Sequence, residues 1–124
     1  MGLNKPVDFT TAKLLKEKGF DENCRFGYNG SFEPHHIGLI EFGYLQRNSE
    51  LLKLTYSAPT IAEVVMWLYE KHGIWIMVRR IEYKTLIRWD FYVNENYPKQ
   101  KLVGYNSPTE AYEAAIEYVL TKLT

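Results

Sequence analysis

The chain has 124 residues, of which 46% are hydrophobic and 24% charged. This composition is typical of a globular protein and excludes a disordered or fibrous chain. The length predicts a single domain over residues 1–124 with one core. Fifteen basic residues balance fifteen acidic ones, so no overall field draws the chain toward nucleic acid.

The cysteine content and the hydropathy pattern bear on the compartment. Cys24 is the single cysteine, so no internal disulfide can form, which favours a reducing environment. No run approaches the roughly 18 apolar residues of a membrane span, and the N-terminus lacks the apolar stretch of a secretion signal. We therefore expect a cytoplasmic protein without a membrane partner.

The N-terminal half begins with one short helix and continues irregularly. Residues 10–18 favour a helix, with Thr10 or Thr11 as its cap and Gly19 as its stop. Residues 20–57 are interrupted by glycines and carry brief aromatic stretches, which predicts short strands and loops. Part of this segment is expected to cover a face of a sheet, because a long structureless loop is rare in a compact domain.

A second helix is predicted from Ile61 to about His72. Thr60 and Glu63 have the spacing of a capping box, and Gly73 supplies a stop. The apolar residues of this segment spread beyond a single stripe, which indicates contacts on two sides of the helix; they are Ile61, Val64, Val65, Met66, Trp67, Leu68 and Tyr69.

Two runs rich in β-branched and aromatic residues follow, at 74–78 and 86–93, and predict an antiparallel hairpin. With Lys84 and Thr85 as a two-residue turn, Arg79 faces Asp90. The same register pairs Met77 with Tyr92 and Trp89 with Arg80. The face expected to join the core carries Ile74, Ile76, Val78, Ile87, Trp89, Phe91 and Val93. The other face mixes large aromatic and charged residues: Trp75, Met77, Arg79, Ile81, Tyr83, Arg88, Asp90 and Tyr92.

A third short strand is predicted over 102–105, followed by a last helix. Ser107 is its expected cap, Pro108 stands at the first helical position, and Glu110 completes the start signal. The fold class is therefore α+β, with an antiparallel sheet of three or more strands packed against helices. Residues 60–124 are expected to follow the order α-β-β-β-α.

Few residues are candidates for catalysis or metal binding. His35 and His36 are neighbours whose side chains point apart on an extended chain, so a metal site is not expected there. Cys24 lies close after two acidic residues, Asp21 and Glu22, which disfavour a reactive thiolate. His72 suits the negative end of its helix. We therefore predict no catalytic site, no metal and no cofactor, and a protein that is not an enzyme.

The aromatic face of the hairpin is the candidate for binding. Exposed aromatic and methionine side chains mark protein interfaces, and the residues concerned are Trp75, Met77, Tyr83 and Tyr92. The partner would be another protein or a second copy of the chain. In the alternative reading, residues 20–57 simply cover this face. A nucleic-acid interface is less expected; it would use Arg79, Lys84, Arg88, Lys99 and Lys101.

The order of elements after residue 60 is similar to that of double-stranded RNA-binding domains, and residues 107–115 resemble their last helix. Pro108 and Thr109 stand where that family carries lysines, and Glu113 and Glu117 make the helix acidic, which repels phosphate. The ending of the chain is also similar in topology to HicB-type antitoxins.

Four segments resemble a family of small proteins from gut bacteria and their prophages. They are Leu14 to Glu22, Ser57 to Thr60, Trp67 to Ile74 and Glu110 to Tyr118. The resemblance implies an accessory protein of mobile-element origin. It implies no activity and no site residues, because that family has no assigned function.

Overall fold

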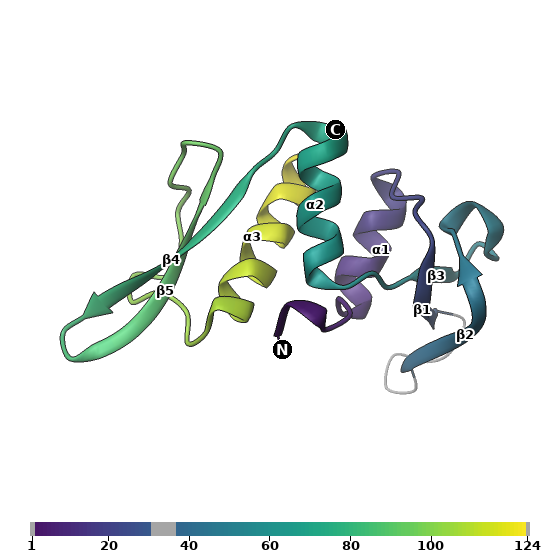
Figure 1. The fold of residues 1–124 in the computed structure, drawn as a ribbon, viewed down its shortest axis with the longest axis horizontal. Coiled ribbons are helices and arrows are strands. Elements are labelled where there is room, and N and C mark those ends of the chain that lie inside the picture. Colours follow the sequence, from purple (N-terminus) through teal and green to yellow (C-terminus); the bar gives the residue numbers. More distant parts are fainter. Residues whose placement is uncertain (1, 31–36, 124) are drawn as a thin grey trace. The chain divides into compact units, whose positions relative to one another are not determined.

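The computed structural model describes residues 2–30 and 37–123. Its contacts divide the chain into two compact units. We call residues 2–5 with 61–122 the hairpin unit, and residues 6–60 with 123 the three-stranded unit. Each unit combines helix with antiparallel strands, which confirms the α+β class (Figure 1). The single domain over residues 1–124 stays a prediction. Within the described ranges, no helix is long and apolar enough to cross a membrane.

The three-stranded unit begins with α1 (Phe9–Glu17). Its cap is Asp8, whose side chain accepts a hydrogen bond from the Thr11 amide at 2.8 Å. The prediction of Thr10 or Thr11 as the cap was wrong, because the carboxylate of Asp8 occupies that role two or three residues earlier. Gly19 ends the helix at a φ of 89°, as predicted.

The sheet of this unit has the strand order β2-β1-β3, and both pairings are antiparallel. Its strands are β1 (Cys24–Asn29), β2 (Leu39–Gln46) and β3 (Thr55–Ser57), with the 3-10 helix η3 (Asn48–Glu50) between the last two. Helix α1 packs on β1 and β3. The Phe9 ring lies edge-on to Tyr28 and Tyr56, at centroid distances of 5.9 and 5.7 Å. The strands expected within residues 20–57 therefore build a sheet of their own.

The hairpin unit holds η1 (Gly2–Asn4), α2 (Ile61–His72) and α3 (Pro108–Lys122). The bounds of α2 are as predicted, and Gly73 ends it at a φ of 65°. At the start of α3, the Ser107 hydroxyl accepts a hydrogen bond from the Glu110 amide at 3.1 Å, which confirms the expected cap. Helix α2 contacts α3 and η1.

Strands β4 (Ile76–Tyr83) and β5 (Leu86–Val93) form the predicted hairpin in the predicted register, with Arg79 opposite Asp90 and Met77 opposite Tyr92. Both strands pack against α3. Ala111 and Ala115 of α3 are fully buried, which lets the helix approach the sheet closely. Ile76 and Phe91 are buried on the facing side of the hairpin, as predicted for the core face. The prediction was wrong for Ile87, which is 52% exposed because it lies next to the turn of the hairpin.

The third strand predicted over 102–105 is reduced to one bridge, between Tyr105 and Trp89. The chain turns here instead of extending. Gly104 has a φ of 76°, and its amide donates to the carbonyl oxygen of Lys101 at 3.0 Å. This turn leaves Leu102 88% exposed. The sheet of the hairpin unit therefore has two strands, and the order predicted for residues 60–124 loses its third strand.

Candidate protein-interaction site

The outer edge of β5 is closed by the chain that follows it. The amides of Trp89 and Tyr105 donate to each other's carbonyl oxygens, at 3.0 and 2.8 Å. Val93 and Asn96 exchange a similar pair, at 2.9 and 3.0 Å. Between these pairs, the Gln100 side chain accepts from the Phe91 amide at 3.0 Å and donates to the Phe91 carbonyl oxygen at 2.6 Å. Residues 94–105 thus replace a third strand on this side.

The outer edge of β4 is open. The backbone N–H and C=O groups of Trp89, Phe91 and Val93 point away from β4. In an antiparallel pair, the residues opposite them must then point their own backbone groups away from β5. These opposite residues are Arg80, Val78 and Ile76. Among residues 2–30 and 37–123, no backbone group pairs with this edge. Strand β4 therefore presents unpaired N–H and C=O groups, which is the property of an edge strand.

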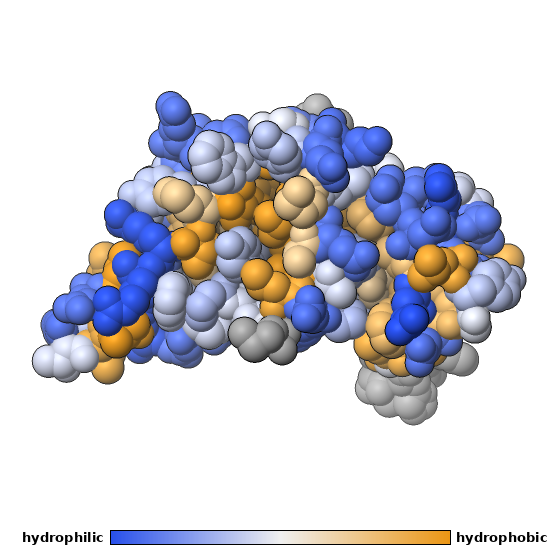
Figure 2. Space-filling view, in the orientation of Figure 1, coloured by the Kyte–Doolittle hydropathy of each residue, from blue (hydrophilic) through white to orange (hydrophobic). Residues whose placement is uncertain are grey.

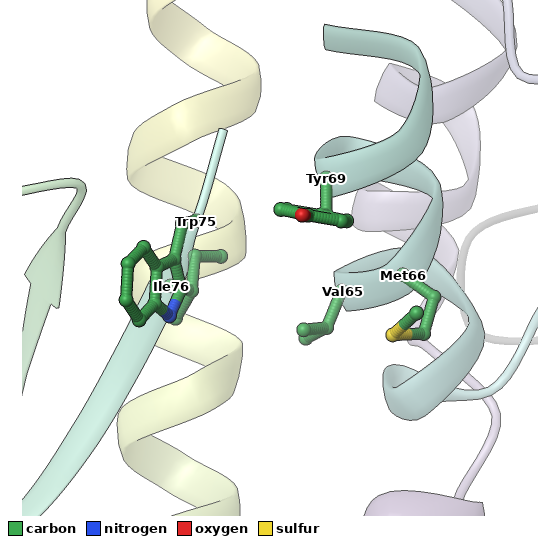
Figure 3. A pocket seen from close by; sticks show the side chains of 5 residues that line it. All are labelled: Val65, Met66, Tyr69, Trp75 and Ile76. Carbon is green, nitrogen blue, oxygen red and sulfur yellow. The ribbon is translucent and has the colours of Figure 1, made fainter. Parts of the chain in front are cut away.

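An apolar groove of about 440 Å³ lies beside the beginning of β4. Val65 and Tyr69 project from α2 toward Trp75 and Ile76, and Met66 completes the lining (Figure 3). The space-filling view shows apolar side chains gathered in the hollow between β4 and α2 (Figure 2). Met66, Tyr69 and Trp75 are 52%, 59% and 59% exposed, so large apolar side chains face solvent around the hollow.

The groove exists because the hairpin covers only part of the helical layer. Strands β4 and β5 lie against α3, whereas α2 packs beside α3 and against η1 (Figure 1). Among the residues of β4, Ile76 lines the groove together with α2. The open edge and the uncovered helix face therefore meet at the beginning of β4.

Asn94 holds one wall of the groove in place. Its amide donates to the Trp75 carbonyl oxygen at 2.6 Å, and its Oδ1 accepts from the Trp75 amide at 2.8 Å. Asn94 has a φ of 55°, a conformation that asparagine tolerates better than most residues. The backbone of Trp75 is thus fixed before any ligand arrives.

The outer face of the hairpin carries a compact polar cluster. Arg79 donates two hydrogen bonds to Asp90, at 2.9 and 3.2 Å, and Asp90 is only 1% exposed. The guanidinium group also lies 5.0 Å from the ring centre of Tyr92 and 5.9 Å from that of Tyr97. The hydrogen bond to Asp90 raises the pKa of Arg79. Burial, followed by a hydrogen bond to Asp90, raises the pKa of Tyr97. This cluster attaches the loop after β5 to the sheet.

The structure separates the four predicted interaction residues. Trp75 lines the groove, and Met77 is 44% exposed at the same end of the hairpin. Tyr92 belongs to the polar cluster, where its ring centre lies 5.0 Å from that of Tyr97. Tyr83 lies at the turn, six residues beyond Met77 and so about 20 Å away along an extended strand. The alternative reading assigned residues 20–57 to this face; the strands of that segment, at 24–29, 39–46 and 55–57, form the sheet of the three-stranded unit.

The basic residues of the nucleic-acid alternative do not form one row. Arg79 is paired with Asp90, and Arg88 is half-buried opposite Ile81. Two lysines lie over tyrosine rings, Lys84 over Tyr83 and Lys101 over Tyr105, while Lys99 is exposed in the loop.

The candidate catalytic residues are dispersed as well. Cys24 is buried in the three-stranded unit, and the His72 ring lies edge-on to Trp67 at 4.7 Å. His35 and His36 fall outside the described residues. Over the ranges that the structure covers, no group of three or more His, Cys, Asp or Glu side chains could hold a metal ion.

Two features of the site escaped the sequence analysis. The α2 wall was not identified as a binding surface, although the wide apolar distribution around Met66 and Tyr69 was visible in the sequence. The role of Gln100 carried no signal, because a glutamine in a polar loop has no distinctive pattern.

Comparison of the chain with protein-family models, with curated proteins and with solved structures finds no match.

Proposed function

We propose that this protein is a non-catalytic interaction module that binds another protein through the groove between α2 and β4. The observation that carries the proposal is the exposure of Met66, Tyr69 and Trp75 around one hollow. Methionine and aromatic side chains are enriched in protein interfaces, and apolar patches of this kind mark them. Because Asn94 already holds the backbone of Trp75, the chain at this position loses little backbone freedom on binding.

The environment of the nucleophile candidates supports a non-catalytic role. Cys24 is 3% exposed, which keeps its thiol away from a substrate in solution. The sequence resemblance supports an accessory protein of a gut bacterium or prophage, and the single cysteine supports a cytoplasmic location. A second copy of the chain is one partner that this proposal allows.

Selection from a display library of random twelve-residue peptides tests the proposal. Selected peptides should lose at least tenfold in affinity for Met66→Asp, because a charge would enter the groove, and should bind Leu102→Asp like the wild type. Leu102 is an exposed apolar residue outside the groove, so its variant is a matched control. If no selected peptide distinguishes Met66→Asp from the wild type, the groove is not the binding site.

Sedimentation of the wild type and of Trp75→Ala tests self-association. A mass that rises with concentration in the wild type, and does not rise in Trp75→Ala, would identify a second copy as the partner. A monomer at millimolar concentration would remove self-association from the proposal.

The surplus of positive charge over residues 79–101 favours nucleic acid as the second candidate. Six basic side chains stand there against three acidic ones. This candidate predicts a mobility shift with duplex RNA at low salt, and an affinity that falls steeply as salt rises. The absence of a shift at low salt would end it.

A further inference from the structure

We propose that the partner binds as an extended strand that pairs with the open edge of β4 and places alternate side chains in the groove. This inference rests on the proposed function and specifies the chemistry of the partner. The ligand is a peptide segment in which apolar residues alternate with acidic ones.

The backbone of β4 selects a strand as the occupant. The N–H and C=O groups of Ile76, Val78 and Arg80 point away from β5, at every second residue. Only another extended chain offers donors and acceptors with the same spacing. A helix in the groove would satisfy its own backbone and leave this edge unpaired. On the other side of the hairpin, Gln100 and residues 94–105 already make the equivalent bonds, so addition can occur only at β4.

The two faces of the added strand meet different surroundings. Side chains on the same face as Ile76 and Val78 point toward the helical layer, and the one beside Ile76 would cover Met66 and Tyr69 of α2. These positions require apolar residues. Side chains on the opposite face stand beside Met77 and Arg79, at the border with solvent.

Charge determines the preferred residues on that outer face. Strand β4 itself carries Arg79 and Arg80, whose side chains are 49% and 52% exposed, against one acidic residue, Glu82. Acidic residues in the ligand strand complement this surplus, since complementary charge favours association. A second copy of β4 would bring the same positive surplus to the edge, so an acidic strand of a different protein fits better.

The experiment measures binding of a fluorescein-labelled nine-residue peptide to the full chain by fluorescence anisotropy. In this peptide, valine or leucine alternates with glutamate. Arg80→Pro removes one outward amide without breaking a bond to β5, and Arg80→Ala is its matched control, with the side chain removed and the amide kept. We expect Arg80→Pro to bind the peptide about tenfold more weakly than Arg80→Ala, the effect of about one hydrogen bond.

Three further peptides keep the protein unchanged, so that a folding defect cannot mimic the result. A peptide with N-methyl groups on the amides of one edge should lose at least tenfold in affinity, whereas the same groups on the other edge should have no effect. A peptide of identical composition with its residues in blocks should bind at least tenfold more weakly, because its apolar residues no longer share one face.

The outcomes separate this inference from the proposed function. If Met66→Asp abolishes binding but Arg80→Pro and both methylated peptides bind normally, the groove binds a partner and strand addition is wrong. If no peptide binds and a duplex RNA does, both the inference and the proposed function are overturned. If the chain dimerises and the dimer requires the Arg80 amide, the strand that pairs with β4 belongs to a second copy and the inference of a different protein is wrong.

Discussion

The exchange of Gln100 for glutamate should destabilise the hairpin unit, because the contact between Gln100 and Phe91 depends on one donor and one acceptor. The side-chain oxygen accepts from the Phe91 amide at 3.0 Å, and the side-chain nitrogen donates to the Phe91 carbonyl oxygen at 2.6 Å. Glutamate has almost the same shape but replaces the donor by an oxygen. Two oxygen atoms would then face each other where a hydrogen bond existed.

The magnitude follows from the loss of that hydrogen bond and from the carbonyl group that stays unsatisfied. Phe91 is 2% exposed, so water reaches this carbonyl group poorly. The lost bond and the unmet acceptor together should lower the free energy of unfolding by about 2 kcal/mol at pH 7. Repulsion in the folded state raises the pKa of the introduced carboxyl group above its unfolded value of about 4.3. The destabilisation is therefore present at neutral pH and decreases as the pH falls through the raised pKa, where a proton restores a donor.

Urea unfolding monitored by tryptophan fluorescence measures this effect in the right place, because all three tryptophans, Trp67, Trp75 and Trp89, lie in the hairpin unit. Gln100→Ala is the control, since it removes both hydrogen bonds and introduces no titrating group. A Gln100→Glu protein within about 0.5 kcal/mol of the wild type at pH 7, the range of ordinary surface substitutions, would refute this reasoning. A pH dependence equal to that of Gln100→Ala would refute it as well.

Three further substitutions probe other parts of the fold. Arg79→Leu should lower the free energy of unfolding by about 1–2 kcal/mol, because Asp90 loses its partner. The loss is smaller than for a fully buried pair, since the Arg79 side chain is 49% exposed. Urea unfolding measures this loss beside that of Asp90→Asn. Asn94→Gly keeps the positive φ but removes the acceptor of the Trp75 amide. It should lower the free energy of unfolding by about 1 kcal/mol and change the tryptophan emission. Unchanged stability and emission would argue against a role of Asn94 in holding the Trp75 backbone. Burial and Asp8 raise the pKa of Tyr28, so the unfolded state releases its proton first and stability should fall as the pH rises above about 10. Tyr28→Phe should reduce that slope in unfolding experiments between pH 9 and 11, and an equal slope in both proteins would contradict the assignment.

Patterns within short stretches predicted much of the hairpin unit. The start signal at Ser107 and the stop at Gly73 placed the ends of α3 and α2, because caps are local interactions. The two-residue turn at Lys84 and Thr85 was enough to set the register of the hairpin, and with it the pair of Arg79 and Asp90.

Features that depend on distant contacts were not predictable in the same way. The third strand was expected from the apolar residues of 102–105, but the turn at Gly104 overrides that local preference. Predicting the groove requires knowing which helix the hairpin covers. The alternation of residues along β4 does not carry that information. Asp8 outcompeted Thr10 and Thr11 as a cap, although all three side chains can serve.

Residue-resolved amide exchange of the free protein tests directly whether the outer edge of β4 is open while that of β5 is closed. The amides of Val78 and Arg80 should exchange quickly, whereas those of Phe91 and Trp89, which donate to Gln100 and Tyr105, should be protected. Equal protection of the two edges would mean that β4 already has a partner, and an open edge would then be wrong.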